Sequence, residues 1–307
     1  MKPVWLIAAV VAVSSSPRSA AAQACCAGSS VVTPGRLALH EAALVGTQWK
    51  AAAEIGSFDS AGEFSALTRG ASELDLEQDA FAALRLTEHA QAAVLVPILE
   101  TRRSAGSESE FGGGIGDINL NGRYDFTFAG ASKTIPGIGV LAGITFPSGT
   151  PADSSRIRPL ATDATGIGAF QGSFGLALEQ AFGHWLVNVT GVVAQRSARS
   201  VTQAGITTHE QLAAQWTALA AAGYVFDSEA ALALSFAYMT EGDATIDRAA
   251  APDSSHRSTT VTFAGLLPLN DSWRAQAALF ANPPVSKLSL NQPALAGGSL
   301  TLVYAWL

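Results

Sequence analysis

The chain has 307 residues, of which 48% are hydrophobic and 14% are charged. A chain this apolar is not intrinsically disordered, because disorder requires many charges and few large apolar side chains. Its 18 Lys and Arg residues against 25 Asp and Glu residues give a net charge of −7, which is the wrong sign for a protein that binds nucleic-acid phosphates.

The first 24 residues have the organisation of a secretory signal peptide. Lys2 precedes an apolar stretch at residues 4–13, and the segment ends in the small-residue pattern Ala22-Gln23-Ala24. The apolar stretch is too short to cross a bilayer as a helix. We therefore predict a signal peptide over residues 1–24, with cleavage after Ala24.

Cys25 and Cys26, the two cysteines of the chain, would open the mature protein. Two adjacent cysteines cannot by themselves form a disulfide framework or a four-ligand zinc site. Lipid attachment to Cys25 and a metal or redox role for the two thiols remain open, although Gln23 fits a lipoprotein signal poorly. We favour the simplest interpretation, a periplasmic leader of unknown use over residues 25–36.

Beyond the leader, polar and apolar residues alternate with a period of two. Between residues 117 and 128, polar side chains occupy the odd positions, and the even positions are aliphatic, aromatic or glycine. Successive side chains of a strand point to opposite faces, so this pattern predicts a strand with one polar and one apolar face. No apolar run long enough for a transmembrane helix remains, which excludes a helical membrane protein.

Strands of about 9–11 residues are long enough to cross a bilayer as part of a barrel. We predict an all-β fold, a transmembrane antiparallel β-barrel of the outer-membrane type with about 12 strands, over residues 37–307. The second and third strands have the weakest pattern, because residues 90–99 are apolar on both faces. The strands are expected near residues 37–53, 73–87, 90–100, 114–129, 137–147, 168–181, 184–196, 211–226, 230–240, 258–269, 272–282 and 297–306.

The lengths of the connections support the barrel. Outer-membrane barrels have short periplasmic turns and longer external loops. If the first strand runs outward, the external connections are residues 56–72, 101–113, 148–167, 197–210, 241–257 and 283–296, and all are long. The periplasmic connections are short, at residues 88–89, 183, 227–229 and 270–271, with residues 130–136 somewhat longer.

Aromatic residues give a second check, because amphipathic rings favour the two membrane interfaces. Five of them fall at the periplasmic strand ends, namely Phe128, Trp185, Phe226, Trp273 and Trp306. Four fall at the outer ends, namely Trp49, Phe146, Phe170 and Tyr238. We predict two aromatic girdles. The strands of a soluble β-sandwich would also alternate polar and apolar residues. A sandwich would not need aromatic residues at both ends of its strands, however, and its solvent face would carry more charge.

The polar faces would line the lumen, because the wall side chains of a twelve-strand barrel do not simply fill it. The predicted lumen-lining residues are Asp75, Glu77, Asp79, Arg85, Asp117, Asn119, Asn121, Arg123, Asp125, Gln171, Glu179, Gln215 and Arg274. Opposite charges on one strand, such as Arg123 beside Asp125, are expected to be structural pairs. Asp75, Glu77, Asp79 and Asp117 gather near the outer mouth and predict an acidic vestibule that favours cations.

One part of the chain resembles a known family. The residues that carry the resemblance are Leu86-Thr87-Glu88-His89-Ala90, the glycine-rich residues 112–116 before Asp117, Thr145-Phe146-Pro147-Ser148-Gly149 and Phe182-Gly183-His184-Trp185. Over residues 80–200 the chain is similar to the outer-membrane transporter family linked to meta-cleavage pathways of phenol degradation. The resemblance implies an outer-membrane channel, which in some members is associated with uptake of aromatic or other hydrophobic compounds.

The sequence holds no catalytic or metal-binding motif of a common type. The five histidines have no metal-ligand spacing, and neither Gly-x-Ser-x-Gly nor His-Glu-x-x-His is present. Gly112, Gly114 and Gly116 precede a strand and not a helix, so we interpret them as a loop end and not a phosphate loop.

We therefore predict a channel or transporter for passive passage of small molecules, not an enzyme, with no cofactor and no metal. The alternative is a non-transport barrel with a structural or adhesive role, and a barrel-embedded hydrolase is less favoured still. The expected partners are outer-membrane lipid, the barrel-assembly machinery and a small-molecule cargo, with no nucleic acid.

Overall fold

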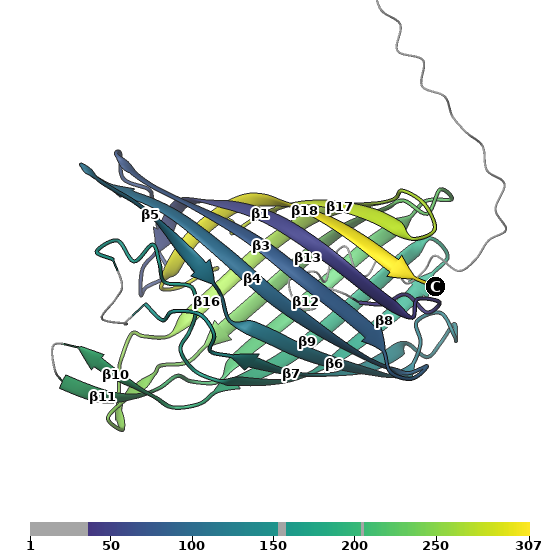
Figure 1. The fold of residues 1–307 in the computed structure, drawn as a ribbon, viewed down its shortest axis with the longest axis horizontal. Helices are drawn as coiled ribbons and strands as arrows, with labels where there is room; N and C mark the ends of the chain where they lie inside the picture. Colours follow the sequence, from purple (N-terminus) through teal and green to yellow (C-terminus); the bar gives the residue numbers. More distant parts are fainter. Residues whose placement is uncertain (1–35, 153–157, 204–205) are drawn as a thin grey trace, which may run out of the picture.

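The computed structural model describes residues 36–152, 158–203 and 206–307, which form a β-barrel (Figure 1). The predicted signal peptide and the leader residues 25–35, including Cys25 and Cys26, lie outside the described residues. None of the described residues belongs to a helix that is long and apolar enough to span a membrane.

Twelve antiparallel crossings form the barrel wall in the described chain. In order around the barrel, the strands are β1 (Ala43–Phe58), β3 (Ala71–Arg85), β4 (Ala90–Ala105), β5 (Glu108–Ile115), β6 (Ile118–Thr127), β7 (Gly137–Phe146), β8 (Gln171–Phe182), β9 (Trp185–Arg196), β12 (Gln215–Val225), β13 (Ala231–Glu241), β16 (His256–Pro268), β17 (Trp273–Ala281) and β18 (Gln292–Trp306). β5 and β6 pair with successive parts of β4 and together make one crossing. β18 pairs with β1, so the sheet closes, and the predicted fold class is confirmed.

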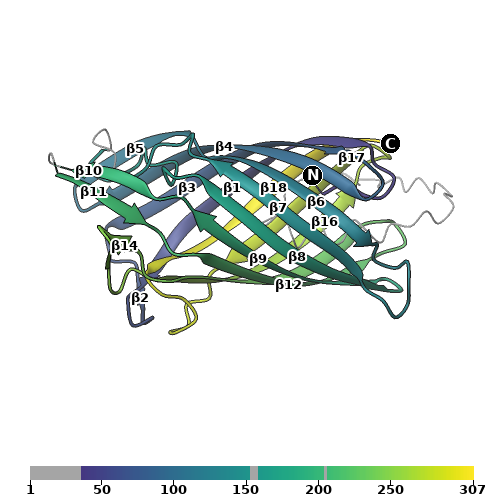
Figure 2. The same ribbon diagram turned by 90° about the horizontal axis from the view of Figure 1, so that it is seen from below.

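The shorter strands lie at the end of the barrel opposite the C-terminus (Figure 2). β2 (Phe64–Ala66) extends the pairing of β1. β10 (Arg199–Gln203), β11 (Ile206–Gln211), β14 (Thr245–Ile246) and β15 (Ala249–Ala250) form a separate four-stranded sheet. This end therefore carries the long connections, and the end with the C-terminus carries the short ones.

The prediction of one external loop is wrong. Residues 101–113 were expected to form a loop, but β4 continues to Ala105 and β5 begins at Glu108, so only two residues turn the chain. The backbone pairing of Arg102 with Phe111 and of Arg103 with Glu110 carries the sheet beyond the main wall.

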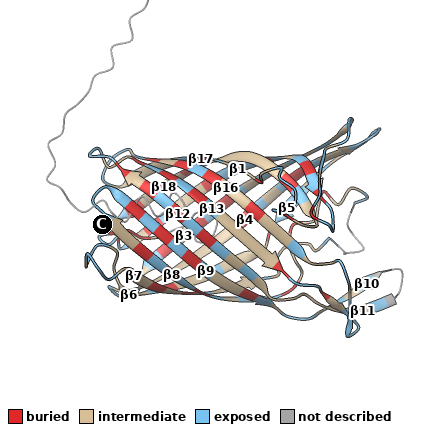
Figure 3. Cartoon of the chain, turned by 180° about the vertical axis from the view of Figure 1, so that it is seen from behind, coloured by how far each residue is buried: buried red, intermediate tan, exposed pale blue. Residues whose placement is uncertain are grey.

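Exposure alternates along the strands as the sequence predicts (Figure 3). On β8, Leu176 is 52% exposed, whereas Glu179 is 2% exposed. On β9, Val189 is 51% exposed and Asn188 is 3% exposed. Large apolar side chains therefore cover the outer surface, and the polar side chains point inward, which is the arrangement of a barrel in lipid.

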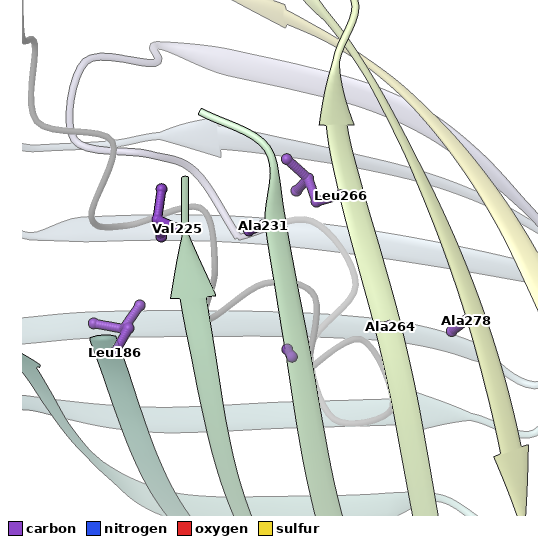
Figure 4. Packing of buried hydrophobic residues seen from close by; sticks show 7 residues of the cluster. Leu186, Val225, Ala231, Ala264, Leu266 and Ala278 are labelled. Carbon is purple, nitrogen blue, oxygen red and sulfur yellow. The ribbon is translucent and has the colours of Figure 1, made fainter. Parts of the chain in front are cut away.

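The inner face also carries apolar side chains in the half of the barrel that has the short turns. One cluster lies on β9, β12, β13, β16 and β17 and includes Leu186, Val225 and Leu266 (Figure 4). A second cluster, on β1, β3 and β18, includes Leu44 and Phe81, and the inward side chains of Ala93 and Leu95 on β4 pack against it. The second cluster explains why residues 90–99 are apolar on both faces.

The first strand begins later than the sequence predicts. A strand was expected over residues 37–53, but β1 begins at Ala43. The Leu37 N–H donates to the side chain of Gln91, and the Ala38 N–H donates to the carboxylate of Glu41. Because side chains satisfy these backbone groups, this stretch does not need a neighbouring strand.

Candidate functional site

The first described residues of the chain lie inside the barrel, at the end with the short turns. The Arg36 Nη1 atom is 2.6 Å from Glu179 Oε1 on β8. Five residues later, Glu41 forms an ion pair with Arg274 on β17. β9, β12, β13 and β16 separate β8 from β17 in the sheet, so the two ends are held on facing walls. Residues 36–41, called here the lumen segment, therefore cross the lumen.

Further contacts hold the lumen segment between its ends. Arg85 on β3 donates hydrogen bonds to the backbone carbonyls of Ala38 and Glu41. Leu37 and Ala38 are 4% and 3% exposed, and Leu37 belongs to the apolar cluster of β1, β3 and β18. Two predicted lumen-lining residues, Arg85 and Arg274, therefore bind the chain's own lumen segment.

A buried charge cluster fixes one end of the lumen segment. Arg123 Nη2 on β6 is 2.6 Å from Asp125 Oδ1 and 3.1 Å from Glu179 Oε1. Asn188 on β9 donates to the same Glu179 oxygen at 3.0 Å. A buried carboxylate is costly unless it is paired and hydrogen-bonded, and Glu179 receives both kinds of contact. Arg123, Asp125 and Glu179, all predicted to line the lumen, form one structural unit with Arg36.

Glycine at position 139 makes this cluster geometrically feasible. β7 lies between β6 and β8, so the guanidinium of Arg123 must pass over β7 to reach Glu179. A Cβ atom on Gly139 would lie 2.9 Å from Arg123 Nη2 and 2.9 Å from Asp125 Oδ1. Any larger residue at this position would push the guanidinium away from Glu179.

The outer half of the lumen has a different character. Asp75, Glu77 and Asp79 alternate on the inner face of β3 and are called here the acidic row. Lys50 on β1 pairs with Glu77 at 2.9 Å, but both side chains are more than a quarter exposed. Thr101 donates to Asp75 at 2.8 Å. Asp79 is 5% exposed, and its Oδ1 atom accepts no hydrogen bond from the described residues.

The outer half also holds an ion pair that the sequence interpretation missed. Arg196 on β9 contacts the carboxylate of Glu241 on β13 at 2.7 Å and donates to Gln171 on β8 at 3.0 Å. Arg196 lies directly opposite Gln171 in the register of β8 and β9. Both residues lie within the predicted strands 168–181 and 184–196, so the register of that hairpin would have placed these two side chains together.

Asp117 holds an external connection and differs from the rest of the predicted vestibule. Its carboxylate accepts hydrogen bonds from the Gly149 N–H at 2.9 Å and from the Ile167 N–H at 2.7 Å. These two residues belong to the two ends of the connection between β7 and β8. The contacts of Asp117 are therefore those of a structural clamp on this connection.

The same connection folds over the inner face of β5. Arg103 on β4 donates to the Leu160 carbonyl at 2.9 Å. A Cβ atom on Gly112 would lie 2.6 Å from Thr162 Oγ1 and 2.8 Å from its carbonyl oxygen. Gly112 and Gly114 thus lie within β5 and not at a loop end as predicted, and Gly112 allows the connection to approach closely. Residues 160–162 of the connection therefore lie against the inner face of the sheet at its outer end.

The remaining predicted lumen-lining residues make short local contacts. Asn119 on β6 donates to Thr145 on β7 at 2.7 Å. Asn121 shares the inner face of β6 and lies beside Gly143. Gln215 on β12 donates to the Met239 sulfur at 3.0 Å. Whether these residues meet a passing solute stays a prediction.

The aromatic residues of the two predicted girdles lie at or near strand ends, except Trp49, which was expected at the outer end of its strand but is the seventh of the sixteen residues of β1. At the inner end, Tyr304 packs edge-on against Trp273 and Trp306, and Tyr224 packs in the same way against Trp185 and Phe226. At the outer end, Phe146 packs edge-on against Phe170, and Tyr238 lies near the end of β13. Trp49 is exposed, but it lies in the middle of β1 because the strand continues to Phe58. The sequence interpretation did not include His89 in the girdle. Its ring stacks on that of Phe128, with the two ring centroids 4.9 Å apart, and so extends the inner girdle.

Within residues 36–152, 158–203 and 206–307, no three His, Cys, Asp or Glu side chains are grouped so that they could hold a metal ion. No family model matches the chain, and no curated protein matches it.

Solved structures do resemble it. The chain is similar to an outer membrane channel from Pseudomonas putida, with a TM-score of 0.70 and 15% identity over 89% of this chain and 97% of that one. It is also similar to the β-domain of the Bordetella autotransporter BrkA, with a TM-score of 0.52 and 7% identity over 87% of this chain and 100% of that one. The likeness shows the fold, a barrel of the outer-membrane type.

Proposed function

We propose that this chain is an outer-membrane channel through which small molecules pass by diffusion. The acidic row on β3 carries the proposal. Asp79 is 5% exposed, but the other two inward carboxylates, Asp75 and Glu77, are only partly buried and have one partly exposed lysine beside them. Such charges are costly in a dry interior but stable against water. An apolar outer surface around a polar inner face is the arrangement of barrels that enclose an aqueous channel.

The solved structures and the N-terminal sequence support a location in the outer membrane. The similar structure from Pseudomonas putida is described as an outer membrane channel, and we extend that role to this chain. The proposed signal peptide, residues 1–24, would direct export, and the barrel-assembly machinery would insert the barrel into outer-membrane lipid. The two aromatic girdles would lie at the two lipid interfaces.

We further propose that the cargo includes aromatic or other hydrophobic small molecules, as the family resemblance implies. Apolar side chains line part of the inner wall, among them Leu186, Val225 and Leu266; they are buried in this structure and would meet the apolar part of such a molecule only once they are uncovered. The acidic row would at the same time favour cationic over anionic solutes.

Solute flux into liposomes tests the proposal and separates it from a structural or adhesive role. Purified mature protein is reconstituted into liposomes, and swelling is followed with a neutral sugar, with benzyl alcohol, with benzylamine and with benzoate. The channel proposal predicts protein-dependent influx, which is faster for benzylamine than for benzoate of similar size. Liposomes with heat-unfolded protein provide the background rate. Influx at the background rate for every solute would favour the non-transport alternative.

A further inference from the structure

We infer that the lumen segment is a built-in plug, and that its two ion pairs keep the channel closed at its periplasmic end until they part. The inference rests on the proposed channel function. It concerns residues 36–41, which cross the lumen between β8 and β17 near its periplasmic end.

The lumen segment is attached to the wall without being part of it. The Ala42 N–H donates to the Trp306 carbonyl at 2.8 Å, and the Ala42 carbonyl accepts from the Arg85 N–H at 2.8 Å. Residue 42 is therefore fixed between β18 and β3. The contacts of residues 36–41 are made mainly with side chains, and β1 begins only at Ala43. The segment can thus swing about residue 42 without breaking the strand pairing that closes the barrel.

The first latch is Arg36 on Glu179. When Arg36 leaves, Glu179 keeps its contacts with Arg123 and Asn188. The Glu179 carboxylate therefore still has a cation and a hydrogen-bond donor when the plug is absent. The Arg36–Glu179 pair can break without leaving an isolated buried charge on the wall.

The second latch is Glu41 on Arg274. Both side chains are nearly buried, with 3% of the Glu41 side chain and 11% of the Arg274 side chain exposed. Arg274 sits on the wall opposite Glu179, so this pair fixes the far end of the plug. Glu41 also accepts the Ala38 N–H at 2.8 Å and so shapes the segment that it anchors. Removal of the Glu41 charge weakens both contacts at once, and we expect this latch to control opening.

Single-channel recording of the full mature chain in planar bilayers tests the plug. Glu41→Gln should raise the ratio of open to closed time by about ten-fold or more, the change expected for loss of one charge-assisted hydrogen bond. Glu241→Gln is the matched control, because it removes an equally buried carboxylate from its pair with Arg196 without touching the lumen segment. Exchanging the charges by Glu41→Arg with Arg274→Glu should restore the ion pair and with it part of the closure, because an arginine cannot accept the Ala38 N–H.

A second measurement follows the plug without any use of conductance. Ala38→Cys, in a chain with Cys25→Ser and Cys26→Ser, places a thiol where the native side chain is 3% exposed. A hydrophilic maleimide should label this thiol slowly in the otherwise native chain and about ten-fold faster when Glu41→Gln is added. Heat-modified gel migration confirms that every variant contains a folded barrel.

The two readouts separate the possible failures. Faster labelling together with more opening supports the plug. Equal labelling of both chains, or faster labelling with unchanged open time in a conducting barrel, overturns it. If labelling becomes faster but no variant conducts, the proposed channel function fails, and a plug has nothing to close.

Discussion

The two halves of the lumen use charge in opposite ways. In the inner half, Arg123, Asp125 and Glu179 are buried and mutually paired, and together with Arg274 they hold the lumen segment in place. The outer half also contains one buried pair, Arg196 with Glu241, but the acidic row on β3 has one lysine partner, and that ion pair is partly exposed. Paired, buried charges fix a structure, whereas unpaired charges near water create a potential that a solute meets. The comparison assigns closure to the inner half and selectivity to the outer half.

The largest expected difference between the two halves is the loss of folding stability when one charged residue is replaced. Arg123→Gln removes the cation that pairs with both Glu179 and Asp125 in a buried site. Breaking a buried pair in this way lowers the free energy of unfolding by roughly 3–5 kcal/mol. Lys50→Gln removes the lysine from a half-exposed pair and should cost about 1 kcal/mol or less. Reversible urea unfolding of both variants in lipid vesicles measures the difference. Equal losses would mean that the inner charges are not a closed structural unit.

The contact between β5 and the connection that follows β7 should respond to one methyl group. Gly112→Ala places a Cβ atom against the backbone of Thr162, and overpacking of this kind costs roughly 1–3 kcal/mol. Gly172→Ala on β8 is the matched control, because nothing lies within 4 Å of the added atom. We expect Gly112→Ala to speed protease cleavage within residues 147–170, whereas Gly172→Ala should leave the rate unchanged. If both variants are cleaved like the native chain, the connection does not depend on contact with β5.

The period-two pattern was sufficient to predict the wall of the barrel, because a strand in lipid has only two faces and each side chain must belong to one of them. The same rule misplaced residues 37–42. Leu37 and Leu39 continue the alternation of β1, yet Leu37 is buried in the lumen and Leu39 is exposed outside any strand. A local pattern cannot show that a backbone is satisfied by Gln91 and Arg85, which lie about fifty residues further along the chain.

The candidate site was predictable residue by residue but not as a set of contacts. The inward charges were identified from alternation, and Arg123 was expected to pair with Asp125, as it does. Its reach to Glu179 could not be predicted, because it depends on the glycine at position 139 in the strand between them. One signal did point to the lumen segment. Residues 90–99 are apolar on both faces, and an apolar inner face indicates that other parts of the chain cover the wall there.

The reversal potential across a salt gradient in planar bilayers tests the central claim, a channel whose outer half selects by charge. The measurement compares the native barrel with one that carries Asp75→Asn, Glu77→Gln and Asp79→Asn, each also in the Glu41→Gln background. These substitutions keep the side-chain volumes and remove the charge. We predict cation preference in the native barrel that falls in the triple variant and weakens as salt shortens the screening length to about 8–10 Å. A folded barrel that conducts in no background, or one whose selectivity is the same with and without the three carboxylates at low salt, would contradict the account.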